Sequence, residues 1–309
     1  MLQYRHLWML VLGLSVAAPV RAAEADKYIP GDSQVVVAVN VSHLLEAPLV
    51  KKYALEHIKE GIKKNTEAQH VLGAIGLDPL KDISSVVIAG NPSASKPENI
   101  LIIMHGKFDQ AKIEAAVAEH VKQKPDDVKI TKEGGVTVYE FHNPNQPKPG
   151  YAAFASSGTI VASPSKEYVL DAVARKTGKL GKEFAAALAK ADTKKEIWMV
   201  GMITDDIKKA MANFPLTANI ATKLEALTGN VSVADGVQLN ISVYATDEKA
   251  ASDFGKLLEA AKGFIPQDND MVKEVVDGLK VSNEKSTVTI SAKVSSELID
   301  KLAKMRGGQ

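Results

Sequence analysis

The sequence of 309 residues contains no cysteine. This absence excludes disulfide bonds, metal sites built from thiolates, and catalysis by a thiol nucleophile. It also excludes a lipoprotein that is anchored through a lipid-modified N-terminal cysteine. A chain of this length without cross-links must be stabilised by its hydrophobic core alone.

Aromatic residues and surplus charge are also scarce. Phe, Trp and Tyr make up 5% of the residues, and 38 Lys and Arg stand against 37 Asp and Glu. Proteins that bind nucleic acids carry basic surfaces and aromatic side chains that stack on bases. The sequence therefore predicts neither a nucleic-acid partner nor electrostatic attraction to an anionic membrane.

One apolar run stands near the N-terminus. Leu7–Val20 follows a short basic start, and small residues at Ala22 and Ala25 come shortly after it. This order is typical of a secretory signal peptide, and the run is short for a membrane span. We predict a signal peptide over residues 1–25, cleaved after Ala22 or Ala25, and a periplasmic or extracellular mature chain without an integral membrane segment. The alternative is an uncleaved membrane anchor.

Strand-like and helix-like segments alternate through the rest of the chain. Apolar residues at every second position, together with turn signals, predict two single strands at 34–41 and 196–203 and five hairpins at 84–106, 128–141, 151–163, 230–245 and 279–294. Apolar residues at helical spacing predict helices at 42–64, 109–121, 164–178, 205–214, 216–227, 247–261 and 295–305, with N-caps expected at Ser42, Asp109, Thr246 and Ser295.

The two halves of the chain follow the same order of elements. Residues 28–178 and 194–305 both read strand, helix, hairpin, helix, hairpin, helix, which indicates a diverged internal duplication. We predict an α+β fold with two diverged ferredoxin-like βαββα-type halves, at 26–180 and 181–309. One or two antiparallel sheets would carry helices mainly on one face.

Two strands are apolar on both faces. "ILIIMH" (100–105) and "EIWMVGMI" (196–203) lack the polar alternation seen in "VQLNISVYA" (237–245). Something must therefore cover their second side. Extra helices above a central strand, a dimer interface and an apolar ligand cavity are the three explanations.

Residues 163–178 contain two signatures of penicillin-recognising serine enzymes. Ser163 and Lys166 form S-x-x-K, and Lys176, Thr177 and Gly178 form K-T-G. A helix between the motifs would hold them about 15–18 Å apart, and the chain has no S-x-N or Y-x-N. We predict instead that Ser163 is an N-cap, that Pro164 occupies the first helical position and that Gly178 ends the helix.

Other catalytic, metal and cofactor motifs are missing. The histidines show no spacing of metal ligands. Asp268 and Asp270 resemble the start of a calcium loop, without the Gly and the distal Glu that such a loop needs. No glycine-rich nucleotide-binding loop occurs. We predict no catalytic residue, no cofactor and no metal.

Two stretches resemble a known kind of protein. "YIPGDSQVVVAVNVSHLLEAPLVKK" (28–52) and "GTIVASPSKEYVLDAV" (158–173) are similar to segments of exported bacterial proteins of unknown function. Those proteins open with such a strand after a signal peptide and later carry a strand-to-helix unit of this kind. The resemblance, over about residues 28–178, implies an exported α+β protein and supplies no activity.

Three functional hypotheses follow. The first is a non-enzymatic exported protein of the cell envelope that binds a protein partner or a ligand through its sheet surface, with a homodimer as one arrangement. The second is a carrier of a lipid or another apolar ligand, in a cavity over the first-half sheet. The third is a serine acyl hydrolase that uses Ser163.

Overall fold

The computed structural model of the chain describes residues 27–64, 72–73, 76–93, 96–142, 148–176, 178–265 and 270–306. The predicted signal peptide and both cleavage sites, Ala22 and Ala25, lie outside these residues, as do Thr177 and Asp268.

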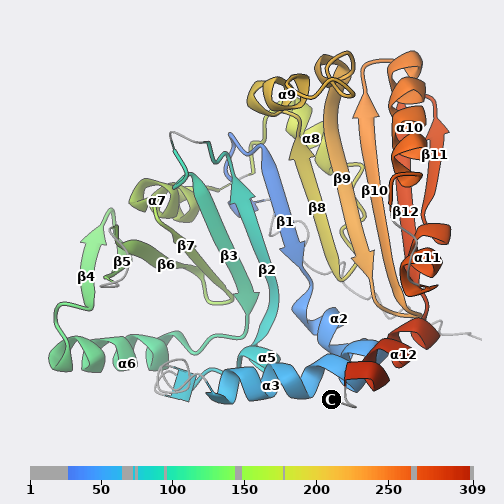
Figure 1. Cartoon of the computed structure of the whole chain (residues 1–309). Helices are drawn as coiled ribbons and strands as arrows, with labels where there is room; N and C mark the ends of the chain where they lie inside the picture. The colour runs from blue at the N-terminus through green and yellow to red at the C-terminus, as the bar shows by residue number, and fades with distance from the viewer. Residues whose placement is uncertain are drawn as a thin grey trace, which may run out of the picture.

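Twelve strands form one antiparallel sheet in the order β11-β12-β10-β9-β8-β1-β2-β3-β7-β6-β5-β4 (Figure 1). The predicted α+β class with an antiparallel sheet is confirmed. The strands are β1 (Val35–Val39), β2 (Ile83–Gly90), β3 (Ile100–Gly106), β4 (Val128–Glu133), β5 (Val136–Phe141), β6 (Gly150–Ser156), β7 (Thr159–Ser163), β8 (Ile197–Met202), β9 (Leu224–Ser232), β10 (Val237–Ala245), β11 (Lys280–Glu284) and β12 (Thr287–Val294).

Helices line one end of the strands and pack on both faces of the sheet; in Figure 1, α2, α3, α5, α6 and α12 lie along one end and α9 lies at the other. The helices are α2 (Val41–Glu46), α3 (Leu55–Lys64), α5 (Pro79–Asp82), α6 (Gln110–Gln123), α7 (Lys166–Ala174), α8 (Lys182–Leu188), α9 (Asp205–Ala212), α10 (Glu248–Lys262), α11 (Asp270–Asp277) and α12 (Ser296–Arg306), with a π-helical turn η1 (Val50–Ala54) and a 3₁₀ turn η2 (Ala221–Lys223).

The two halves meet where β1 pairs with β8. Val37 on β1 lies opposite Met199 on β8, so both halves share one sheet. Each half has the same strand order outward from this seam, β1-β2-β3-β7-β6 and β8-β9-β10-β12-β11, and β5 and β4 extend the first half. Ferredoxin-like halves are not confirmed, because the first three strands of each half are direct neighbours in chain order.

The sheet has two faces, which we name after the first-half helix that packs on each. The α7 face carries Val36 and Ala38 of β1 and is covered by α7, α8 and the segment at Tyr28 and Ile29. The core beneath these helices includes Val87, Leu101, Ile103, Val161, Trp198 and Val200. It therefore draws on both halves of the chain.

The opposite face, the α6 face, is covered mainly at its margins. In the second half, Phe254 and Leu258 of α10 pack against Val243 and Val288. Near the seam, Ala47 and Val50 pack against Val233. Because α7 and α10 lie on opposite faces, the prediction of helices mainly on one face is wrong.

Two predicted helices differ from the structure. The helix expected at 42–64 begins at Val41 and breaks at Ala47, whose extended conformation (φ −61°, ψ 133°) is the one favoured before proline. The helix expected at 216–227 does not form: residues 216–220 are turns, only the 3₁₀ turn η2 follows, and β9 already begins at Leu224. In β9, buried Leu224 and Ala226 flank exposed Glu225, which is the period of a strand.

Candidate functional site

The α6 face carries an unbroken row of paired residues across all twelve strands. The row runs Val281, Ile290, Ile241, Gly229, Met199, Val37, Ile88, Ile102, Ala162, Ala152, Tyr139 and Ile130. Tyr139 is the one member with a polar group. Strands with one wet face normally alternate polar and apolar side chains, so this face is built to contact something apolar.

The centre of this row is partly open to solvent. We call Met199, Val37, Ile88 and Ile102 the apolar strip. Ile88 is 42% exposed, and the other three are half-buried. Val35, Val39 and Val86 extend the same apolar surface along β1 and β2. Exposed apolar surfaces of this kind mark binding sites in soluble proteins.

A cavity of about 450 Å³ adjoins the apolar strip, between α6 and the first-half sheet. Its exposed surface is apolar, and its volume lies within the range of small-molecule sites. The lining residues are Ile102, Met104, Ile113, Val117, Tyr139, Phe141, Gly150, Tyr151, Ala152, Ala153, Phe154, Ile160, Ala162, Ser163 and Pro164.

The equivalent place in the second half is filled. Helices α6 and α10 both follow the third strand of their half. Helix α10 lies close to the sheet through buried Ala250, Ala251 and Gly255, and a Cβ on Gly255 would come within 2.4 Å of Asn283. Helix α6 buries only Ile113 among its fully described residues. The cavity therefore arises because α6 stands off the sheet where α10 does not.

Tyr139 joins the sheet to α6 beside this cavity. Burial, the nearby Glu114 charge on α6 and the interaction of the hydroxyl with that carboxylate raise the pKa of Tyr139 to about 12. The hydroxyl is therefore protonated at neutral pH. The interaction of Tyr139 with Glu114 connects β5 to the loosely packed helix α6.

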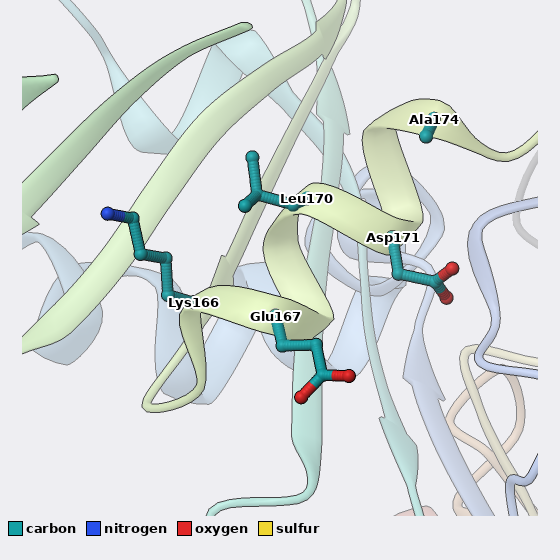
Figure 2. A pocket seen from close by; sticks show the side chains of 5 residues that line it. All are labelled: Lys166, Glu167, Leu170, Asp171 and Ala174. Carbon is teal, nitrogen blue, oxygen red and sulfur yellow. The ribbon is translucent and has the colours of Figure 1, made fainter. Parts of the chain in front are cut away.

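A second depression, of about 620 Å³, runs along the outer side of α7. Its lining residues all come from this one helix, and in Figure 2 their side chains point in different directions. They are Lys166, Glu167, Leu170, Asp171 and Ala174. A single wall leaves most of a ligand in water, whereas binding sites bury most of it, so this surface is a weaker candidate.

Ser163 occupies a structural position. Its hydroxyl donates to the carbonyl of Ile100 (2.6 Å) and accepts from the backbone N–H of Ser165 (2.9 Å). The N-cap of α7 is Ser165, which accepts from the N–H of Tyr168 (3.5 Å), so the predicted capping role of Ser163 is wrong. Pro164 accordingly precedes the cap and does not occupy the first helical position.

The remaining serine-enzyme residues also fail to form a site. Lys166 is paired with Glu133, and the hydrogen bond to Glu133 raises the pKa of Lys166, so this lysine is not a proton acceptor for Ser163. Helix α7 ends at its C-cap Arg175, and Gly178 lies beyond that end, contrary to prediction. Lys176 follows the cap directly. This geometry gives the serine hypothesis no support.

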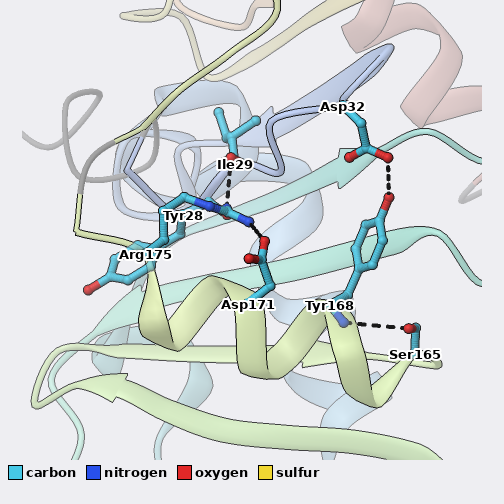
Figure 3. A network of polar contacts seen from close by, with 7 residues as sticks. All are labelled: Tyr28, Ile29, Asp32, Ser165, Tyr168, Asp171 and Arg175. Carbon is cyan, nitrogen blue, oxygen red and sulfur yellow. Dashed lines mark hydrogen bonds and ion pairs between the residues drawn. The ribbon is translucent and has the colours of Figure 1, made fainter.

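The two stretches that carry the resemblance contact each other (Figure 3). Arg175, at the end of α7, donates to the carbonyls of Tyr28 (2.7 Å) and Ile29 (2.8 Å) and pairs with Asp171. The Tyr168 hydroxyl donates to Asp32 (2.8 Å). Burial and then this bond hold the pKa of Tyr168 far above its usual value. These residues fasten the N-terminal segment to the fold.

In the described part of the chain, no three His, Asp or Glu side chains gather as a metal site would require. Asp270 begins α11. Of the histidines, His105 is fully buried beside Thr159 (3.1 Å), while His120 and His142 contact carboxylates. No described helix has the length and apolar character needed to cross a bilayer.

No protein-family model, no curated protein and no solved structure matches this chain. The resemblance to exported bacterial proteins stays a prediction, and the function must be inferred from the α6 face itself.

Proposed function

We propose that this protein is a non-enzymatic exported protein that binds an apolar ligand on its α6 face. The cavity beneath α6 would hold a hydrocarbon chain, and the apolar strip would continue the contact toward the seam. The observation that carries this proposal is a cavity of about 450 Å³ with an apolar surface, open to further apolar residues on β1, β2 and β8.

The lining chemistry favours hydrocarbon over a polar ligand. A polar group moved from water into an apolar site without a hydrogen-bond partner costs roughly 1–3 kcal/mol on protein scales. Each methylene buried there contributes about 0.8 kcal/mol. Among the lining hydroxyls, Ser163 is already hydrogen-bonded to Ile100 and Ser165, and Tyr139 interacts with Glu114. An acyl chain therefore satisfies the site without leaving a polar group unpaired.

A protein partner on the apolar strip is the second candidate. Ile88 is 42% exposed at the middle of the strip, and a partner or a second copy that covered it would bury the same surface. Light scattering on the purified protein distinguishes this arrangement. A dimer that dissociates on Ile88→Lys, with unchanged circular dichroism, would support a second copy over a ligand.

Ligand binding is tested by filling the cavity. Ala162 lines the cavity and pairs with Ile102, so Ala162→Phe places a ring where the ligand would lie. We expect the mature protein to bind a fluorescent fatty acid and to carry lipid in native mass spectrometry. Ala162→Phe should weaken fatty-acid binding at least tenfold.

The matched control adds the same side chain elsewhere. Ser282 is exposed on β11 and shares the α7 face with Thr289, so Ser282→Phe should leave fatty-acid binding unchanged. Both variants are first shown to unfold near the wild-type urea midpoint. A wild-type protein that binds no fatty acid and carries no lipid would contradict the proposal, as would equal binding by a well-folded Ala162→Phe variant.

We also infer that the two halves of the chain arose by internal duplication. The equal strand order of the two halves supports an internal duplication. No corresponding observation supports ferredoxin-like halves. We further infer export and removal of residues 1–25. N-terminal sequencing of the protein recovered from the cell envelope tests this, and a retained Leu7–Val20 segment would contradict it.

A further inference from the structure

The end of α9 and the following turn expose two large apolar side chains. Phe214 is 66% exposed and Leu216 is 74% exposed, on either side of Pro215. Ile207, earlier on α9, is 45% exposed. In Figure 1, α9 lies at the end of the sheet opposite α2, α3 and α12. We call residues 214–216 the apolar tip.

Several backbone groups around the apolar tip are hydrogen-bonded within the turn. The N–H groups of Asn213 and Phe214 donate to carbonyls of α9 at 3.3 and 3.1 Å, and those of Thr217 and Ala218 donate to the Phe214 carbonyl at 3.0 Å. Pro215 has no N–H to satisfy. The Thr217 hydroxyl donates to the carbonyl of Met211. This pairing lowers the cost of moving the turn from water to the interfacial layer of a bilayer.

The shape of the apolar tip argues against a protein partner. A stable protein interface buries about 800 Å² on each side. Two side chains on a projecting turn supply far less, since even a large aromatic residue buries about 150–250 Å². A lipid surface needs no complementary shape and accepts single inserted side chains.

The charges of α9 are ordered to suit a bilayer surface. Asp205 and Asp206 stand at its start, farthest in sequence from the apolar tip, and Lys208 and Lys209 lie between them and the tip. Lys209 is 80% exposed, and its ion pair with the similarly exposed Asp206 is long, at 3.9 Å. Lysines one to two turns from an inserted apolar segment can contact lipid phosphates. We propose that the apolar tip inserts into the interfacial layer of a phospholipid bilayer and docks the protein there.

A fluorescent reporter tests insertion directly. The chain is assayed without residues 1–25, so that the apolar run Leu7–Val20 does not itself bind lipid. Trp198 is then the only tryptophan and is 3% exposed, so it gives a nearly constant background. Phosphatidylcholine vesicles should shift the emission of a Phe214→Trp variant to shorter wavelength. An unshifted emission would overturn the proposal.

Co-sedimentation with the same vesicles measures docking. The double variant Phe214→Ser, Leu216→Ser should lose at least ten-fold in vesicle binding. Phe264 is 81% exposed outside the tip, so Phe264→Ser is the matched control and should bind as the wild type does. Equal loss in the control, or retained binding in the double variant, would overturn the proposal. Binding that occurs only to anionic phosphatidylglycerol vesicles and disappears at high salt would do so too, because it would show attachment by charge alone.

The docking proposal is independent of the cavity. Ala162→Phe fills the cavity without touching the apolar tip, so this variant should still bind vesicles. Docking that fails while fatty-acid binding persists would leave the proposed function standing, and the reverse result would leave the docking site standing.

Discussion

At the scale of single residues, Arg175 links the C-terminal end of α7 to the N-terminal segment at Tyr28 and Ile29. Its side chain is 11% exposed and donates to two backbone carbonyls of the N-terminal segment. The guanidinium is suited to this task because it offers several donors in a planar fork.

We expect Arg175→Met to lower the free energy of unfolding by about 2–4 kcal/mol, because hydrogen bonds to a buried charged group contribute roughly 1.5–3 kcal/mol each. Urea denaturation followed by circular dichroism measures this. Lys166→Met is the control, since Lys166 and Glu133 are 31% and 39% exposed and exposed ion pairs contribute little. Equal effects of the two variants would show that Arg175 does not fasten the segment.

Tyr168 should make the protein less stable in alkali. Its pKa in the folded state is raised above the ordinary value of 10.0 by burial and the bond to Asp32. Below pH 10 the hydroxyl is neutral in both states, and its stabilising effect is complete. Above pH 10 the unfolded chain loses the proton first, so the free energy of unfolding falls as pH rises.

Tyr168→Phe should therefore flatten the decline in urea midpoint between pH 9 and pH 11. Tyr139→Phe should flatten it further, because the pKa of Tyr139 is also raised, to about 12. Parallel profiles for wild type and both variants would contradict this assignment.

At the scale of elements, turns were more predictable than caps. Gly134 and Gly135 both have positive φ and form the predicted turn between β4 and β5. Asp109 caps α6 as expected, by accepting from the N–H of Lys112, whereas Asp247 caps α10 in place of the expected Thr246. Such signals are local and depend on a few residues.

Gly236, at the tip of the β9–β10 hairpin, should tolerate no side chain. It has φ +106°, and a Cβ there would lie 2.3 Å from the carbonyl oxygen of Val294. We expect Gly236→Ala to cost about 1–3 kcal/mol of stability. Gly61→Ala in α3 meets no atom within 4 Å and should stabilise by about 0.5–1 kcal/mol. Thermal melts of the two variants should therefore move in opposite directions, and a shared direction would contradict both expectations.

The start of a helix was predicted wrongly where contacts with residues far away in sequence determine it. Ser42 lost its expected capping role because the helix starts one residue earlier, and the preceding Asn40 side chain donates to the carbonyls of Thr193 and Lys195. These partners are over 150 residues away. No pattern near Ser42 indicates them.

At the scale of the whole molecule, the β1–β8 seam makes one unit of the two halves. Val36, Trp198 and Phe184 belong to a single core that crosses the predicted boundary at residue 180. Neither the twelve-strand sheet nor the side on which each helix packs follows from local patterns. The order of elements in each half, however, was readable from the sequence.

The unfolding of the mature protein should be a single transition. Trp198 lies in the shared core and is 3% exposed, so its fluorescence and the far-ultraviolet circular dichroism should change at the same urea concentration. Residues 26–180 alone lack β8 and α8 and should not fold. Two separated transitions, or a folded fragment, would show that the halves are independent domains.

The candidate site was half predictable. Apolar residues on both faces of β3 and β8 showed that a second face needed a partner. These strand residues could not show that α10 packs closely on the sheet whereas α6 leaves a cavity. That difference depends on small residues of α10 such as Ala250 and Gly255. A cavity over the first-half sheet was the second hypothesis from the sequence, whereas its lining by Ile113 and Val117 of α6 was not predicted.

The contacts of Arg175 with Tyr28 and Ile29 affect the order in which parts of the chain fold. Arg175 lies 147 residues beyond the Tyr28 carbonyl that it binds, and β1 receives its second neighbour only when β8 is available. During synthesis or refolding, the valine-rich strand β1 (Val35–Val39) therefore has one unpaired edge until β8 has formed. Strand pairing between residues far apart in sequence slows folding, so unpaired strand edges that can aggregate stay exposed for longer. The part of the chain that is made first is thus among the last to be protected.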